Sequence, residues 1–219
     1  MKPPRKIVTR SPHRRVGYVP CPWLQPQHIA YESLLEAHFI RIALLCPHVQ
    51  EIRHQPFRLS LGSLGTYTPD YLLRCRSLEN LVVEVKPSSH VAKHAAKLNA
   101  AKEILAQKGW EFIVCTEFDI CGNDRSDRAG AILRYARAFV APSSVSRLTE
   151  RLASIEYPIT AASLAQKLDT SLEQVLYLVG RRYFQLVPSL SMDEIYYKEN
   201  GEILHGNLSV RAWISGSAR

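Results

Sequence analysis

The sequence lacks long hydrophobic runs and closely paired cysteines, and its first 20 residues contain no acidic side chain. The first two absences argue against membrane, disulfide-linked and zinc-binding proteins. The apolar runs, such as residues 42–46, fall far short of the roughly 20 residues that a membrane-spanning helix needs. The basic start has no apolar segment behind it, which argues against a secretory signal. Five scattered cysteines without a Cys-x-x-Cys pair argue against a disulfide framework and a zinc site. We expect a soluble protein of a reducing compartment, cytoplasmic and without a membrane partner.

The charge that is present is distributed unevenly. The 28 Lys and Arg residues outnumber the 20 Asp and Glu residues, which gives a net charge of +8. Residues 1–142 hold 20 basic and 12 acidic side chains, a difference of +8, whereas residues 143–219 hold 8 of each. The first 20 residues carry six basic side chains and no acid: Lys2, Arg5, Lys6, Arg10, Arg14 and Arg15. Such clustering favours a polyanion, DNA above all, as the partner of the N-terminal part, with a solubilising tail as the alternative.

The hydrophobic pattern predicts a mixed α/β domain over residues 27–142. Six prolines interrupt residues 1–26, which predicts an extended basic arm ahead of this domain. The expected helices are 27–45, 88–108 and 125–140, and the expected strands are 51–61, 67–75, 81–86 and 111–117. Their order indicates a sheet flanked by helices.

A different pattern follows the linker at residues 141–144. Helices are expected at 145–155, 160–168 and 171–182, and short strands at 183–187 and 194–198. Three helices and a two-stranded wing are typical of a winged helix-turn-helix, here over residues 143–200. Because residues 143–219 carry no net charge, we expect this part to bind protein rather than DNA. The tail at 201–219 is too short to fold alone and is expected to order against a partner.

Acidic residues beside a lysine suggest a catalytic site. Glu84 and Lys86 lie two apart on an expected strand and therefore share a face. Asp70 opens the preceding strand, which a short loop would pair antiparallel with 81–86, so that all three residues meet at one sheet edge. Mg²⁺ prefers carboxylate oxygens and commonly takes only one or two of them. The alternative is alternating charge on an exposed strand, which is common.

Further candidates surround this cluster. Glu32 and Glu36 lie four apart on one helical face, so either can supply another carboxylate. Gln55 before Pro56 is a substrate contact or a structural hydrogen-bonding residue. On the helix after the Glu-x-Lys strand, Lys93 and Lys97 either contact the DNA backbone or form a solvated face.

These residues together resemble the restriction-endonuclease-like PD-(D/E)xK nucleases. The stretches 31–36, 49–57, 67–71 and 83–87 resemble the TnsA family, the endonuclease subunits of heteromeric cut-and-paste transposases. The resemblance covers residues 27–120 well and the C-terminal part more loosely. It implies a restriction-endonuclease-like fold and a Mg²⁺ site, with Mn²⁺ as a substitute. The implied metal ligands are Glu36, Asp70, Glu84 and the carbonyl of Val85, and the implied catalytic lysine is Lys86.

The family resemblance also implies a place in transposition. TnsA cuts the 5′ strands of transposon ends, a TnsB-type DDE recombinase cuts and joins the 3′ ends, and a TnsC-type AAA+ ATPase recruits both to target DNA. The sequence therefore predicts a Mg²⁺-dependent transposition endonuclease that acts with such partners. Two alternatives stay open: a stand-alone restriction or resolvase-type nuclease, and a winged-helix regulator whose first domain is not catalytic.

Overall fold

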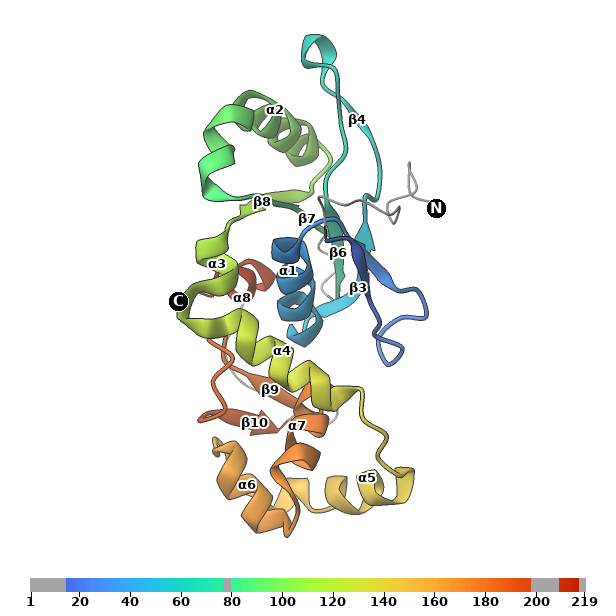
Figure 1. The fold of residues 1–219 in the computed structure, drawn as a ribbon, viewed down its shortest axis with the longest axis vertical. Coiled ribbons are helices and arrows are strands. Elements are labelled where there is room, and N and C mark those ends of the chain that lie inside the picture. The colour runs from blue at the N-terminus through green and yellow to red at the C-terminus, as the bar shows by residue number, and fades with distance from the viewer. Residues whose placement is uncertain (1–14, 77–79, 198–208, 217–219) are drawn as a thin grey trace. The chain divides into compact units, whose positions relative to one another are not determined.

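The computed structural model describes residues 15–76, 80–197 and 209–216 of the chain (Figure 1). Contacts divide the chain into two compact units, Met1–Gly122 and Asn123–Arg219. Arg5, Lys6, Arg10 and Arg14 of the predicted arm lie outside the described residues.

A four-stranded sheet with the order β3-β6-β7-β8 forms the centre of the first unit. Its strands are β3 (Val49–His54), β6 (Tyr71–Cys75), β7 (Asn80–Val85) and β8 (Glu111–Cys115). β6 pairs antiparallel with both β3 and β7, and β7 pairs parallel with β8, so the sheet is mixed. All of β7 after Asn80 is buried, as expected of a central strand covered on both faces.

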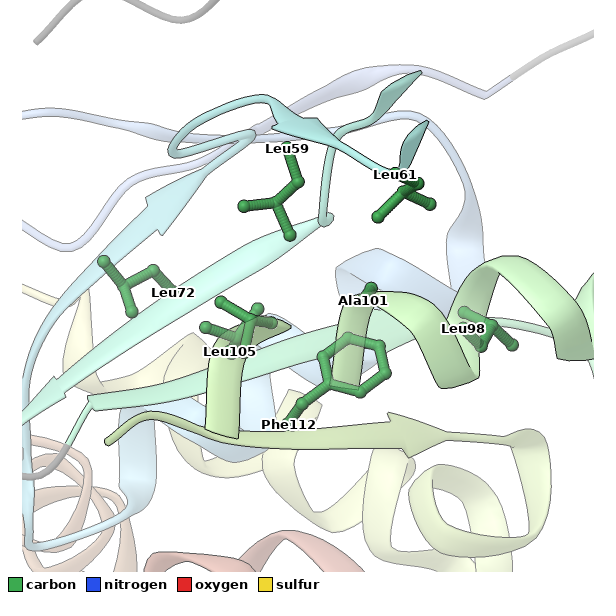
Figure 2. Close-up of a cluster of buried hydrophobic side chains, with 8 residues drawn as sticks. Leu59, Leu61, Leu72, Leu98, Ala101, Leu105 and Phe112 are labelled. Atoms are coloured by element: carbon green, nitrogen blue, oxygen red, sulfur yellow. The ribbon is translucent and has the colours of Figure 1, made fainter. Parts of the chain in front are cut away.

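Helices α1 (Leu34–Leu45) and α2 (Ser88–Gln107) cover opposite faces of this sheet. On one face, Phe39 of α1 packs against Tyr71, with ring centroids 5.3 Å apart. The next residue, Leu72, points to the other face because side chains alternate along a strand. There it joins a cluster of buried side chains from α2, the sheet and the neighbouring hairpin, shown in Figure 2: Leu59, Leu61, Leu72, Val82, Leu98, Ala101, Leu105 and Phe112.

Two hairpins and a short helix complete the first unit. β1 (Gly17–Val19) pairs antiparallel with β2 (Ile29–Tyr31), and β4 (Leu59–Ser60) pairs antiparallel with β5 (Thr66–Tyr67). Helix α3 (Glu117–Cys121) follows β8 and begins with a capping box from Thr116 and Asp119.

The expected helix at 27–45 is wrong in its first part. Residues 29–31 form strand β2, and the helix starts only after Ser33, whose side chain accepts a hydrogen bond from the Glu36 amide as the N-cap. The arm is likewise not wholly irregular, because Gly17–Val19 supplies the partner strand. In the same way, proline-containing turns divide the expected strands 51–61 and 67–75 into β3 with β4 and β5 with β6.

The second unit contains helices followed by a two-stranded hairpin and a last helix. The strands β9 and β10 pair antiparallel. Its elements are α4 (Arg125–Ala136), α5 (Pro142–Thr149), α6 (Ala161–Leu168), α7 (Leu172–Gly180), β9 (Phe184–Leu186), β10 (Ile195–Tyr197) and α8 (Val210–Ser215). The sequence analysis placed α4 in the endonuclease-like domain. In the structure α4 packs against α7, which approaches so closely that a Cβ on Gly180 would lie 2.5 Å from the Ala136 Cβ.

The described part of the C-terminal tail folds against its own chain. Trp213 and Ile214 of α8 are almost completely buried. The buried guanidinium of Arg125 donates to the carbonyls of Trp213, Ile214 and Pro188, at 2.6, 3.0 and 2.9 Å. The expectation that the whole tail orders only against a partner is therefore wrong for residues 209–216, because Arg125 satisfies the carbonyls at the end of this short helix.

The fold class is confirmed as mixed α/β with a central mixed sheet flanked by helices. None of the five cysteines, all of which lie within the described residues, forms a disulfide. None of the helices in the described ranges combines the length and the apolar content needed to cross a membrane.

Candidate active site

Strands β6 and β7 bring Asp70, Glu84 and Lys86 together. Asp70 stands immediately before β6, and its Oδ2 accepts a hydrogen bond from the backbone amide of Val85 at 2.9 Å. Glu84 and Lys86 flank Val85, the last residue of β7, and Lys86 Nζ lies 2.7 Å from Glu84 Oε1. The predicted antiparallel pairing of these two strands is confirmed.

Tyr67 holds the other oxygen of Glu84. Its hydroxyl donates to Glu84 Oε2 at 2.5 Å, and its ring meets Phe112 edge-on in the core on the α2 face. Burial and the charge of Glu84 raise the pKa of Tyr67, which keeps the hydroxyl protonated as a donor. The sequence analysis quoted Tyr67 within a motif but assigned it no contact. That contact depends on the β4–β5 hairpin, which the sequence pattern did not predict.

Glu36 reaches the same region from the first turn of α1. Its Oε1 accepts from the Ser33 hydroxyl at 2.9 Å, and its Oε2 accepts from the Glu32 amide at 2.9 Å and the Tyr71 hydroxyl at 3.1 Å. Glu36 therefore stabilises the start of α1. Through Tyr71, the residue next to Asp70, it is also joined to the start of β6.

Negative charge accumulates at this edge of the sheet. Burial, and then the charges of Glu84 and Glu36, raise the pKa of Asp70 well above its ordinary value, against the opposing effects of the Val85 amide and Lys86. Burial also raises the pKa of Glu36, although hydrogen bonds from Glu32, Ser33 and Tyr71 oppose the shift. A site with this excess of carboxylates is chemically suited to a cation.

Asp70 and Glu84 offer carboxylate oxygens, the type of ligand that Mg²⁺ prefers. Among residues 15–76, 80–197 and 209–216, no group of three or more His, Cys, Asp or Glu side chains is arranged to hold a metal ion. Glu36 accepts hydrogen bonds at the start of α1, and Asp70 Oδ2 accepts one from the Val85 amide. The two oxygens of Glu84 contact Tyr67 and Lys86. One or two carboxylates, completed by water and substrate phosphate, are the usual protein ligands of Mg²⁺.

Gln55 forms hydrogen bonds with Asp70, just before β6, and with Glu32, two residues before α1. Its backbone amide donates to the Asp70 carbonyl at 2.7 Å, and its side-chain Nε2 donates to Glu32 Oε1 at 3.2 Å. Its φ of 40° lies in the left-handed region, which is strained for a residue with a side chain. Sequence alone gives no sign of this conformation. Gln55 and Glu32, both considered above as candidates, are therefore brought to the same edge as Asp70.

The predicted DNA contacts are only partly within the described residues. Arg15 is exposed and stands just before β1. Lys93 and Lys97 are exposed one turn apart on α2, which begins two residues after Lys86. Their role in binding DNA stays a prediction.

Residues 46–117 match the family model described as TnsA-like endonuclease N terminal. This segment is similar to the N-terminal endonuclease domain of TnsA-like proteins. The matched segment covers about a third of the sequence and contains Asp70, Glu84 and Lys86, whereas Glu36 precedes it. No curated protein gives a significant match. The resemblance stated from the motifs is thus confirmed, and the TnsA-like segment supports a nuclease, an enzyme that hydrolyses DNA.

Proposed function

We propose that the chain is the Mg²⁺-dependent endonuclease subunit of a transposase, which hydrolyses the 5′ strands of transposon ends during cut-and-paste transposition. It would act with a TnsB-like DDE recombinase and a TnsC-like AAA+ ATPase. One observation carries the proposal. The hydrogen bond from the Val85 amide to Asp70 sets Glu84 and Lys86 beside that carboxylate, within the TnsA-like segment.

The residues take separate roles in this proposal. Asp70 and Glu84, with the carbonyl of Val85, would hold Mg²⁺, and Glu36 would add negative charge through its link to Tyr71. A bound Mg²⁺ supplies polarisation of the scissile phosphate and lowers the pKa of a coordinated water. Tyr67 fixes one oxygen of Glu84. Lys86, now paired with Glu84, would donate to a phosphate oxygen and offset the negative charge that develops during hydrolysis.

For the second unit we propose a winged-helix domain that binds a protein partner, namely the ATPase. Two short helices, each begun by a side-chain N-cap from Thr160 or Ser171, precede the β9–β10 hairpin, the order expected of helix-turn-helix and wing. The absence of net charge in residues 143–219 favours a protein over DNA as its partner.

An excision reaction reconstituted with the recombinase and ATPase tests the proposed activity. Asp70→Ala should lower 5′-strand cleavage at least about a hundredfold, because several kcal/mol of transition-state stabilisation depend on the bound metal, while 3′ cleavage persists. Glu103→Ala, which removes an exposed acid on α2, should leave both cuts unchanged. A gel that resolves the two strands measures each cut.

Two results would redirect the proposal. Unchanged 5′ cleavage by Asp70→Ala would refute the catalytic assignment. Efficient cleavage by the purified chain without any partner would instead favour a stand-alone nuclease.

A further inference from the structure

A groove of about 270 Å³ runs along the free edge of strand β3. Gln25, Gln27 and His28 line one side, and residues 51–56 line the other. Because β3 is the first strand in the sheet order, its outer edge has no neighbouring strand in the four-stranded sheet. The groove is therefore bounded by Gln25, Gln27 and His28 rather than by a further strand of this sheet.

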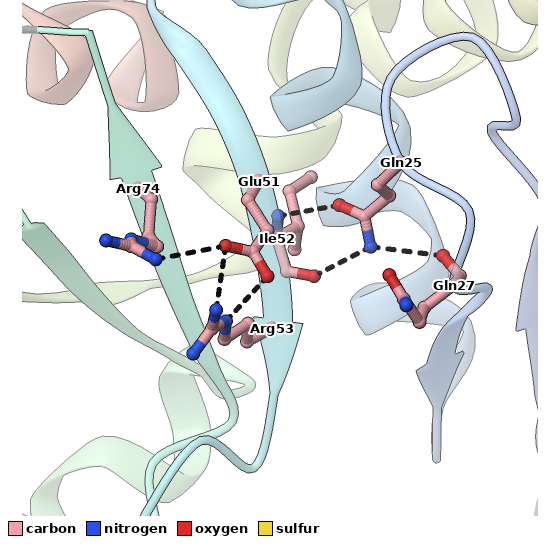
Figure 3. A network of polar contacts seen from close by, with 6 residues as sticks. All are labelled: Gln25, Gln27, Glu51, Ile52, Arg53 and Arg74. Atoms are coloured by element: carbon pink, nitrogen blue, oxygen red, sulfur yellow. Dashed lines mark hydrogen bonds and ion pairs between the residues drawn. The ribbon is translucent and has the colours of Figure 1, made fainter. Parts of the chain in front are cut away.

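The side chain of Gln25 occupies the backbone groups of β3 that another strand would need. Its Oε1 accepts from the Ile52 amide at 2.9 Å, and its Nε2 donates to the Ile52 carbonyl at 3.1 Å (Figure 3). Nε2 also donates to the Gln27 carbonyl at 3.1 Å. A peptide that bound by strand addition would have to break these bonds, so recognition in the groove falls to side chains.

Arg53 contributes a guanidinium group to the lining of the groove. Its Nε and Nη2 donate to the two oxygens of Glu51, at 2.6 and 3.0 Å, which holds the guanidinium in one orientation. These two bonds use two of its five N–H groups, and the side chain remains 40 % exposed. A planar, pre-oriented guanidinium is well suited to a phosphate.

Gln55 connects the groove to the candidate active site. It lines the groove, while its backbone amide donates to the carbonyl of Asp70 at 2.7 Å. The groove therefore shares Gln55 with the surroundings of Asp70.

We propose that this groove binds the DNA strand next to the scissile phosphate, with Arg53 donating to a backbone phosphate. The inference rests on the proposed nuclease function and adds a substrate-binding surface to it. Arg53 belongs neither to the basic arm nor to α2, where the sequence predicts DNA contacts.

Arg74 provides a matched control for Arg53. Its Nη1 lies 3.5 Å from Glu51 Oε2, so both arginines share one acidic partner, as Figure 3 shows, but Arg74 does not line the groove. Each alanine substitution removes one positive charge from an exposed side chain. A general electrostatic effect would thus weaken DNA binding equally in both variants, whereas a groove contact would affect only Arg53.

The test measures fluorescence anisotropy of a short mixed-sequence DNA duplex with the full-length chain, at low salt and with EDTA. Arg53→Ala should raise Kd about tenfold, the loss expected for one charged hydrogen-bonded contact, and Arg74→Ala less than about twofold. Arg53→Lys should recover part of the affinity because it keeps the charge. Melting temperatures of the variants verify that each is folded.

Equal effects of the two alanine variants, or no binding by the unsubstituted chain, would overturn the groove proposal. So would unchanged DNA binding by Arg53→Ala together with lost co-purification of a protein partner, which would make the groove a protein-docking site. Loss of 5′ cleavage in Asp70→Ala is measured independently, so the nuclease function can stand when the groove proposal fails.

Discussion

At the scale of single residues, the surroundings of Asp70 oppose ionisation of its carboxyl group. Burial is the largest cause of its raised pKa, and Glu84 and Glu36 add repulsion. Because the folded pKa lies above the unfolded one, the unfolded chain loses this proton first as pH rises. The ionised carboxylate therefore costs stability at neutral pH, a cost that a bound divalent cation would offset.

Asp70→Asn should consequently stabilise the metal-free protein at neutral pH. The amide keeps an oxygen to accept from the Val85 amide but removes the charge. We expect the melting temperature to rise by a few degrees, since about 1 kcal/mol corresponds to roughly 2–4 °C in a chain of this size. The difference from the unsubstituted chain should vanish as pH falls to the ordinary carboxyl pKa of 3.8.

Melting curves in EDTA and in Mg²⁺ across this pH range measure the effect. Mg²⁺ should raise the melting temperature of the unsubstituted chain more than that of Asp70→Asn. A variant less stable than the unsubstituted chain at neutral pH without metal would contradict the electrostatic account.

Some contacts of the candidate site could be predicted from the sequence and others could not, because they depend on different features of the fold. Asp70, Glu84 and Lys86 follow from the two-residue period of a strand and from one short antiparallel connection, so their proximity was predictable. The contact of Tyr67 with Glu84 depends on a hairpin, and that of Gln55 with Asp70 on a left-handed backbone conformation. Neither is encoded in periodicity.

At the scale of elements, apolar periodicity located the helices and strands better than it located their ends. α2 matches its expected range to within a residue, since Gly109 with φ 71° follows its end. The start of α1 was missed because apolar residues continue from β2 into the helix, and only the N-cap Ser33 marks the boundary. The sequence analysis assigned α4 to the endonuclease-like domain, whereas it packs against α7. The apolar face of a helix does not specify which element it packs against.

The packing of α7 on α4 predicts the effect of a single methyl group. In Gly180→Ala the new Cβ would lie 2.5 Å from the Ala136 Cβ and 3.1 Å from the Ile132 carbonyl oxygen, so the helices must separate. We expect a destabilisation of about 1–3 kcal/mol despite the better helix propensity of alanine. Denaturant unfolding measures it.

Gly122→Ala is the matched control for this substitution. Gly122 has a φ of −52°, and a methyl group added there would meet no heavy atom within 4 Å, so its substitution should change stability by less than about 1 kcal/mol. Equal stability of Gly180→Ala and the unsubstituted chain would show that the close approach of the two helices is not rigid.

At the scale of the whole molecule, the net positive charge and the candidate catalytic residues both lie in the N-terminal part of the chain. The excess of positive charge lies in residues 1–142, which also contain the TnsA-like segment and the buried carboxylates. The described part of the arm begins at Arg15, two residues before β1, where Gly17 pairs with Tyr31 directly ahead of Glu32. Arg15, the first described residue of the arm, therefore stands two residues before the strand that pairs with the segment ahead of Glu32, a pairing that the sequence pattern did not predict.

The most direct test of the account is a crystal structure of the full-length chain soaked in Mn²⁺, with the ion located by its anomalous scattering. The account predicts an ion bound by carboxylate oxygens of both Asp70 and Glu84, at roughly the 2.0–2.2 Å typical of small divalent cations, with Lys86 beside the site. An ion held elsewhere, or none at these carboxylates, would contradict it.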